Sequence, residues 1–374
     1  MPSQYKKYRE ELEKIIEKSG IVINGGESWD PQIKNLGTYK RILSQGPLGL
    51  GESYVDGWWD VKRLDEFFYG LLTANLEINS ESSFFNFLNL LKYKVTNPQS
   101  LRKAFNIGKK HYNLGNDLFY YMLDNRMIYS CGYWKDANNL NEAQELKLEL
   151  SCKKLNLEEG MKVLDIGCGF GGFLKYAAEN YRINGIGITV SEEQKKLADK
   201  LCKGLPIEIR LQDYRTINGK FDRIVSIGMF EHVGLKNYRT YMKKIHELLE
   251  DEGLFLLQTI GKNKPGPINA WINRYIFPDA HIPTINEISK SFEGLFVMED
   301  WHNFGTDYDK TLIAWNENFQ DNWGKLEKNY DERFKRVWEY YLLSSAGAFR
   351  AREFQLWQIV LSKGGVPEGY KSIR

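Results

Sequence analysis

The segment VLDIGCGFGG, residues 163–172, contains the residues whose types and spacing point most directly to chemistry. Three alternate glycines, Gly167, Gly169 and Gly171, follow a hydrophobic run. A glycine-rich turn at the carboxyl end of a parallel strand lets the backbone approach a bound ligand closely. Asp165 lies two residues before the first glycine, where a carboxylate can accept hydrogen bonds and offset positive charge. We therefore predict a cofactor site at this strand tip, with an aspartate that only caps the turn as the alternative.

The order of the glycines separates two classes of cofactor-binding enzyme. A dinucleotide-dependent dehydrogenase would show G-x-G-x-x-G at the start of the helix and an acidic residue about 20 positions later for the ribose. This chain has G-x-G-x-G-G, and Thr189 and Gln194 stand where the acid would be. The Gln194 amide can replace a carboxylate as a neutral donor and acceptor. Because of the glycine order and the missing acid, a dehydrogenase is the second interpretation. Asp213 and Tyr214 follow the third apolar run and are placed to hold an adenine ring.

The elements that position these residues are short apolar runs alternating with charged helical stretches. Helices are expected at 170–181, 192–203 and 237–250, and the runs are KVLDIG, INGIGIT, IEIRLQ, FDRIVSI and GLFLLQTI. This alternation predicts an α/β fold with a Rossmann-like, doubly wound parallel sheet. Residues 297–315 resemble two edge strands joined by a turn, and residues 316–362 have helical periodicity.

The N-terminal part of the chain has a different pattern of apolar residues, with helical spacing. An amphipathic helix is predicted at 5–18, and apolar segments with helical spacing follow at 64–76 and 84–91. We expect two domains, a small helical domain at 1–105 and the doubly wound domain at 106–374.

Composition excludes several classes of protein. With 51 basic and 49 acidic residues, the net charge of +2 excludes a strongly basic nucleic-acid-binding protein. The 4 cysteines form no CxxC pair and are typical of reduced thiols in a cytoplasmic protein. No apolar run reaches the roughly 18 residues that cross a bilayer. The 5 histidines lack the spacing of metal ligands, so no metal is expected.

Taken together, the motifs resemble the cyclopropane-fatty-acyl-phospholipid synthases and the related mycolic acid cyclopropane synthases, which are S-adenosylmethionine-dependent methyltransferases. The resemblance covers nearly the whole chain and rests on KHYNLGNDLFYYML, MIYSCGYW, VLDIGCGFGGF, GITVSEEQ, LQDYR, MFEHVG, AWINRYIFP, EDWHNFGTDYDKTL and GAFRAREFQLWQ. It implies a class I methyltransferase that adds a methylene unit to the cis double bond of unsaturated phospholipid acyl chains, through a carbocation. Relatives that add a methyl branch to lipids or methylate amines share these motifs, so such a methyltransferase is an alternative. A lipid-binding protein with a vestigial cofactor site is another.

The resemblance also implies the roles of individual residues. The cofactor contacts fall on Tyr129, Ser130, Gly167, Gly169, Thr189, Gln194, Asp213, Tyr214 and Ile227. A bicarbonate ion that acts as the base is held by the backbone of Cys131 and Ile260 and by the side chains of Glu231 and Tyr308.

The chain departs from the family at two positions. Gln258 stands where the family often has histidine, and its amide can donate one hydrogen bond to the anion. Ser345 stands where some members carry a cysteine, which argues against covalent thiol catalysis.

The resemblance further implies a cytoplasmic homodimer that works peripherally at the inner face of the membrane. The front helices are then expected to dock lipid and mediate dimer contact. Trp58, Trp59, Phe67 and Phe68 would lie near the membrane, and a simple packing role for them is the alternative.

Overall fold

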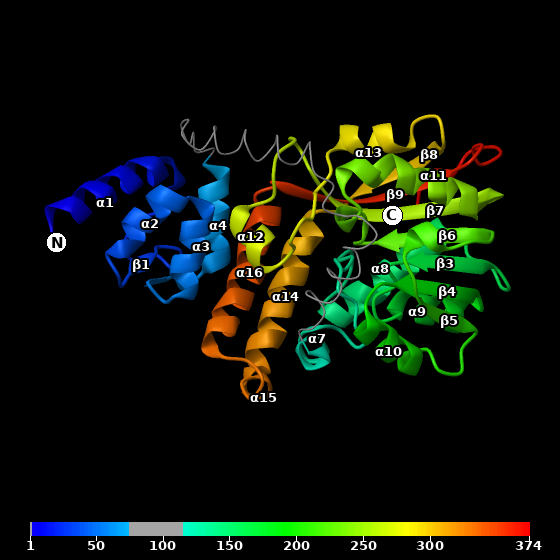
Figure 1. Ribbon diagram of the computed structural model, residues 1–374, viewed down its shortest axis with the longest axis horizontal. Coiled ribbons are helices and arrows are strands. Elements are labelled where there is room, and N and C mark those ends of the chain that lie inside the picture. Colours follow the sequence, from blue (N-terminus) through cyan, green and yellow to red (C-terminus); the bar gives the residue numbers. More distant parts are fainter. Residues whose placement is uncertain (1, 75–114) are drawn as a thin grey trace. The chain divides into compact units, whose positions relative to one another are not determined.

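The computed structural model describes residues 2–74 and 115–374 (Figure 1). Two compact units emerge, and each is assembled from separate stretches of chain. The first comprises Met1–Thr96, Gly266–Pro278 and Leu312–Phe354, and the second Asn97–Pro265, Asp279–Thr311 and Gln355–Arg374. The predicted division at 105/106 differs from this arrangement, because two later segments fold with the front of the chain.

A seven-stranded sheet forms the centre of the second unit, in the order β5-β4-β3-β6-β7-β9-β8. Its strands are β3 (Lys162–Ile166), β4 (Asn184–Thr189), β5 (Ile207–Leu211), β6 (Phe221–Ile227), β7 (Leu249–Lys262), β8 (Val297–Asn303) and β9 (Phe354–Ser362). Strands β3 to β7 pair in parallel, and β8 pairs antiparallel with β9. The chain runs outward from β3 to β5 and then returns to β6 on the other side of β3. The strand order thus reverses between β3 and β6, where ligands bind in open α/β sheets, and the predicted doubly wound α/β fold is confirmed.

Helices cover both faces of this sheet. They are α7 (Asn116–Met122), α8 (Leu140–Lys154), α9 (Gly172–Tyr181), α10 (Glu192–Leu201), α11 (Tyr238–Leu248) and α13 (Ile285–Phe292). Val163 of β3 shares a buried cluster with residues of α8, α9 and α10, whereas its neighbour Leu164 belongs to the cluster under α11 and α13. Successive side chains of a strand point to opposite faces, so the apolar runs that look continuous in the sequence fill two separate cores.

One predicted element of this region is wrong. The first of the two expected edge strands is β8, but the second is helix α14 (Thr306–Asp321). Leu312, Trp315 and Phe319 are buried at helical spacing, and Asp307 and Asp309 in the first turn suit the positive end of the helix dipole. The predicted helical character of 316–362 likewise ends before β9.

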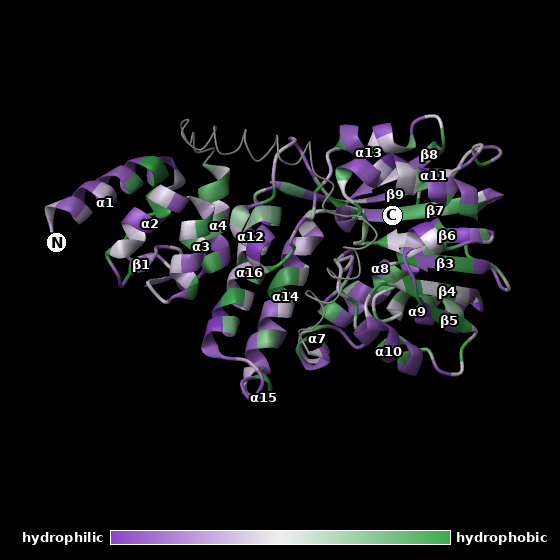
Figure 2. Ribbon diagram, in the orientation of Figure 1, coloured by the Kyte–Doolittle hydropathy of each residue, from purple (hydrophilic) through white to green (hydrophobic). Residues whose placement is uncertain are grey.

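The first unit is mainly helical, as predicted for the front of the chain. Its elements are α1 (Ser3–Ile16), α2 (Gly37–Gln45), α3 (Pro47–Val55), α4 (Leu64–Thr73), α12 (Ala270–Tyr275), α15 (Trp323–Leu326), α16 (Glu332–Arg350), and the short antiparallel pair β1 (Gln32–Ile33) and β2 (Trp59–Asp60). Hydrophobic and hydrophilic residues alternate along α16 (Figure 2), as expected for an amphipathic helix. The predicted segment at 84–91 lies outside the described residues.

The core of the first unit depends on close approach between distant segments. A Cβ atom on Gly347 of α16 would lie 2.5 Å from the Asp65 carbonyl oxygen of α4, and Arg350 forms a 2.9 Å ion pair with the Asp65 carboxylate. Trp59, Phe67 and Phe68 are buried in this core. This burial favours the packing role for these three residues, whereas Trp58 is half-buried, and a position of the four near a membrane stays a prediction. Within the described part of the chain, no helix has the length and apolar character to cross a membrane.

Candidate active site

The glycine-rich turn follows β3 directly and adopts the backbone conformation that favours glycine. Gly167, Gly169 and Gly171 have φ angles of 82°, 56° and 82°. A Cβ on Gly167 would meet the Met229 side chain at 2.8 Å, whereas a Cβ on Gly169 would meet no atom within 4 Å. The turn is therefore packed against protein on one side and open at Gly169, as a ligand cradle requires.

Asp165 lies at the end of β3, as predicted, and its side chain is 3% exposed. Burial raises the pKa of this carboxyl to about 7, and the positive charge of Lys147 opposes that rise. A carboxyl whose pKa lies near neutrality at a ligand-binding strand tip is typical of a functional site.

Thr189 and Gln194 come together after β4. The Thr189 hydroxyl donates to Gln194 Oε1 at 2.7 Å, an arrangement that leaves the Gln194 NH₂ group as the donor. Ser191 accepts from the Gln194 backbone N–H and begins α10 as its N-cap. The role of the two residues as a neutral substitute for a ribose-binding acid stays a prediction.

Asp213 and Tyr214 follow β5, but their side chains already have protein partners. The Arg215 guanidinium donates to both oxygens of Asp213 at 2.7 Å. The Tyr214 ring belongs to the core under α11 and meets Tyr241 at 5.0 Å between ring centroids. Their role toward adenine remains a prediction.

Three further predicted cofactor contacts are Tyr129 and Ser130, which precede α8, and Ile227 of β6. Ser130 accepts a hydrogen bond on its hydroxyl from Lys147 Nζ at 3.0 Å. The Tyr129 ring lies edge-on to Phe119 at 5.2 Å. Ile227 ends β6 opposite Gln258 of β7, at the point where the strand order reverses.

Glu231 follows β6 in a short 3₁₀ turn, Phe230–His232, and is 6% exposed. Its Oε1 accepts from the Ile260 backbone N–H at 2.6 Å, and its buried Oε2 has no hydrogen-bond partner among the described residues. Burial raises the pKa of Glu231 to about 7, which the Ile260 hydrogen bond partly opposes. Near neutral pH this carboxyl can carry a proton and donate a hydrogen bond.

The other residues expected to hold a small anion share one cluster, and one of them, Ile260, contacts Glu231. Buried Cys131 belongs to a cluster against which Ile260 and Tyr308 pack. Burial also raises the pKa of the Cys131 thiol, so its side chain stays neutral and only its backbone suits an anion. The Ile260 N–H, predicted to hold the anion, donates to Glu231 instead, because a buried N–H requires an acceptor.

Gln258 has a partner that the sequence does not reveal. Its Oε1 accepts from Gln358 Nε2 at 2.9 Å, and the same Nε2 lies 3.2 Å from the Ser151 hydroxyl of α8. The amide is thus part of a buried polar chain between β7, β9 and α8. The structure does not bring Gln258 into hydrogen-bond contact with Glu231.

Sequence reasoning missed two residues of α8 that contact the site. Lys147 is 1% exposed, and Gln144 Nε2 donates to the Ser130 carbonyl oxygen at 2.8 Å. A signal for Lys147 existed, because it follows Leu140 and Ala143 on one helical stripe. A lysine on an otherwise apolar stripe is rarely buried without a specific role.

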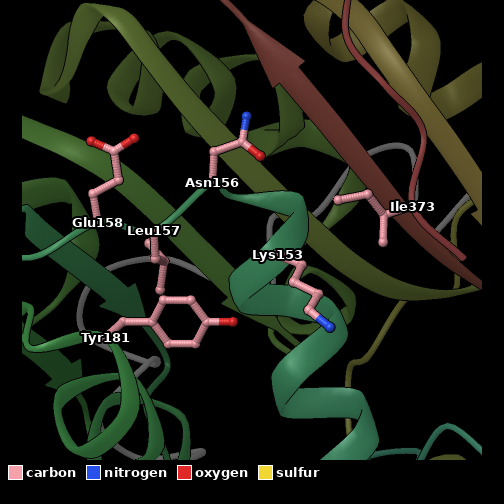
Figure 3. Close-up of a pocket in the computed structure, with 6 residues that line it drawn as sticks. All are labelled: Lys153, Asn156, Leu157, Glu158, Tyr181 and Ile373. Atoms are coloured by element: carbon pink, nitrogen blue, oxygen red, sulfur yellow. The ribbon is translucent and has the colours of Figure 1, made fainter.

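A separate cavity of about 410 Å³ lies near the other end of the sheet (Figure 3). Leu157 and Glu158 on its wall precede β3, whereas Asp165 lies near the end of that strand. In Figure 3 the polar groups of Lys153, Asn156 and Glu158 point in different directions, so they do not form a shared site. Among residues 2–74 and 115–374, no cluster of His, Cys, Asp and Glu could hold a metal ion.

Comparison with known proteins completes the description of this site. Residues 99–359 match the family model of mycolic acid cyclopropane synthetase. The chain is 53% identical over 351 residues to cyclopropane-fatty-acyl-phospholipid synthase of Escherichia coli strain K12, which covers 94% of this chain and 92% of that protein. Its fold is similar to that of the cyclopropane synthase MmaA2 from Mycobacterium tuberculosis, with a TM-score of 0.65, 30% identity, and coverage of 69% and 98% of the two chains. The mycolic acid cyclopropane synthase CmaA1, solved with SAH and CTAB, gives a TM-score of 0.66 at the same identity and coverage.

Proposed function

The chain belongs to the mycolic acid cyclopropane synthetase family, and from that membership we propose how its residues carry out the reaction. It is an S-adenosylmethionine-dependent methyltransferase that forms cyclopropane rings on lipid acyl chains. The observation that carries the detailed proposal is the buried, unpartnered Oε2 of Glu231, which lies in the turn after β6.

The residues around the glycine turn suit the cofactor. Gly169 leaves open space at the strand tip, Asp165 offers a buried carboxylate, and Gln194 offers a neutral donor. We assign these residues to the cofactor site, together with Tyr129, Ser130, Gly167, Thr189, Asp213, Tyr214 and Ile227. When bound, S-adenosylmethionine supplies an electrophilic methyl group on a positively charged sulfur.

The reaction demands a base in a dry environment. Methyl transfer to an alkene leaves a positive charge on the acyl chain, and ring closure requires loss of a proton from the new methyl group. A buried site excludes water, which would otherwise trap the cation. A bicarbonate ion would supply the base. Glu231 fits this ion because its protonated carboxyl can donate to an anion without like-charge repulsion.

Two neighbours would complete the anion site. Tyr308, in the first turn of α14, can donate a hydrogen bond from its phenol O–H, and Cys131 can donate one from its backbone N–H. Cys131 lies in the cluster against which Tyr308 and Ile260 pack, and Ile260 holds the other oxygen of Glu231. Hydrogen-bond donors of the protein would thus orient the bicarbonate ion.

The choice of lipid is supported by the name of the E. coli relative, cyclopropane-fatty-acyl-phospholipid synthase. We assign unsaturated phospholipids as the substrate, reached peripherally at the inner face of the membrane by a cytoplasmic homodimer. The first unit, with exposed Val22, Trp29, Tyr69 and Leu72, is the part we assign to lipid docking and dimer contact.

The test is incubation of the protein with isotope-labelled S-adenosylmethionine and vesicles of unsaturated phospholipid. We expect the acyl chains to gain one CH₂ unit by mass analysis and to show cyclopropane protons by NMR. Ring protons absent from chains that gained the same mass would mean a methyl-branched product. No transfer of label would contradict the enzymatic function itself.

A further inference from the structure

Helix α8 carries two buried lysines with different surroundings. Lys147 and Lys154 are 1% and 0% exposed. Lys154 Nζ lies 3.1 Å from the Asp300 carboxylate, so its charge has a direct partner. Lys147 forms no ion pair with a carboxylate of the described residues, and its Nζ donates to the Ser130 hydroxyl. Because burying an ammonium without an ion-pair partner is costly, Lys147 requires a functional explanation that Lys154 does not.

The contact to Ser130 is one of three by which α8 holds the chain at 130–133. Lys147 Nζ lies 3.0 Å from Ser130 Oγ, and Gln144 Nε2 lies 2.8 Å from the Ser130 carbonyl oxygen. The Tyr133 backbone N–H donates to the Ala143 carbonyl at 2.8 Å. The segment proposed to touch the cofactor therefore rests on α8, and Lys147 is its charged support.

The charge of Lys147 also acts on the predicted cofactor acid. Asp165 and Val163 point to the same face of β3, and Val163 shares its cluster with α8. Burial raises the pKa of Asp165 to about 7 and lowers that of Lys147 to about 8, and the two charges oppose these shifts. The other titratable groups that bear on the pair are Asp124, Cys131, Cys168, Cys202 and Tyr241.

We propose that Lys147 is a positioning residue for the cofactor, which orients the Ser130 hydroxyl and keeps the Asp165 carboxylate ionised. An ionised carboxylate accepts hydrogen bonds on both oxygens, whereas the protonated acid gives up part of that capacity. The inference rests on the proposed cofactor site and adds a residue that acts through two of its members. Lys147 itself remains behind them, in the buried layer between α8 and β3.

Calorimetric titration with S-adenosylhomocysteine at a series of pH values tests the proposal. Lys147→Met keeps the apolar stem and removes the charge. We expect a roughly 10-fold loss of affinity at pH 7, the size typical of a lost hydrogen bond to a charged group. The midpoint of the rise in affinity with pH moves upward, because Asp165 loses the charge that favours its ionised form.

Two control variants separate this role from a structural one. Lys154→Met removes a buried lysine from the same helix, and we expect lower thermal stability with unchanged affinity and midpoint. Gln144→Leu removes the neutral support of Ser130, and we expect weaker binding with an unchanged midpoint. If Lys147→Met does not fold, Lys147→Gln replaces it, since its amide removes the charge but can still donate a hydrogen bond to Ser130.

The outcomes are distinct. Affinity and midpoint equal to wild type in the Lys147 variant would overturn the inference and leave the proposed function intact. A lower affinity with an unshifted midpoint would overturn the role toward Asp165 and leave Lys147 only a support of Ser130, like Gln144. Failure of the wild-type protein to bind S-adenosylhomocysteine would contradict the proposed cofactor site instead.

Discussion

Glu231, which we propose for the reaction centre, has two carboxylate oxygens in different surroundings. One carboxylate oxygen is held by a backbone N–H and the other is buried without a partner. Such an atom costs stability unless a ligand satisfies it. The energy is therefore recovered only when an anion or another hydrogen-bonding group binds beside it.

The first prediction concerns this pair of groups. We expect Glu231→Gln and Tyr308→Phe each to lower kcat by roughly 100- to 1000-fold, the typical effect of removing one positioned group at a reaction centre. Cofactor affinity, measured by calorimetry, should stay close to wild type. A wild-type kcat in Glu231→Gln would mean that the proton leaves by another route.

Asp165 supports a second prediction, about stability and pH. Its pKa is about 7 in the folded protein and near 3.8 in the unfolded chain. The unfolded chain therefore releases this proton first, and the folded state loses stability as pH rises from about 4 to 7. The full effect of this shift is on the order of 4 kcal/mol.

Asp165→Asn removes that titration. We expect the variant to lose less stability than wild type between about pH 4 and 7 in thermal unfolding. Glu231, whose pKa is also raised to about 7, is left to cause the remaining decline. Parallel curves for both proteins would show that Asp165 does not titrate as described.

Gln258 leads to a third prediction, because its amide pairs with Gln358 in a buried polar chain. Removing one amide leaves the other unsatisfied, at a cost of about 1–3 kcal/mol. We expect Gln258→Leu and Gln358→Leu each to destabilise the protein, and the double variant to lose less than the sum. Denaturant unfolding of the four proteins measures this coupling, and strict additivity would contradict it.

At the scale of elements, a helix or strand could be predicted where its residue pattern fits only one type of secondary structure. The run of β3 followed by alternate glycines fits only a strand and a tight turn, and the structure has both. Residues 306–321 contain spaced apolar side chains among acidic ones, which suit a strand or a helix until the burial of Trp315 is known. The partners of Gln258 and Lys147 lie 100 and 17 positions away in the chain. No local pattern specifies such contacts.

The glycine turn itself gives a fourth prediction. Gly169→Ala places a methyl group in the open space of the turn, and we expect cofactor binding to be lost while the fold persists. Gly160→Ala is the matched control, because Gly160 also has a positive φ, 84°, and open space, but lies before β3. Both variants carry a backbone strain of roughly 1–2 kcal/mol. Equal cofactor affinity in the two variants, measured by calorimetry, would contradict the assignment of the turn.

At the scale of the whole molecule, the first unit is built from segments of both halves of the chain. Helix α16 contacts α4 at Gly347, where no larger residue fits, and Arg350 neutralises buried Asp65. Because of these contacts, the two compact units differ from the two domains that the sequence pattern predicts, with a boundary at 105/106.

A fifth prediction follows for truncated protein. Deletion of residues 1–105 exposes the apolar face of α16 and leaves Arg350 without Asp65 and Glu66. We expect the shortened chain to aggregate or to lose its cooperative thermal transition. A monomeric, cooperatively unfolding product by calorimetry and light scattering would show that the second unit is stable alone.

The pairing of α4 with α16 also has a consequence for biosynthesis. Ribosomes add about 5–20 residues per second, so α4 emerges well over ten seconds before α16. During that interval Phe68 lacks its α16 partner Tyr340, and the surface that will receive Gly347 is uncovered. The nascent protein therefore passes through a stage at which its N-terminal helices expose apolar surface and are incompletely folded. Chaperone capacity and translation speed would then affect how much folded enzyme a cell obtains.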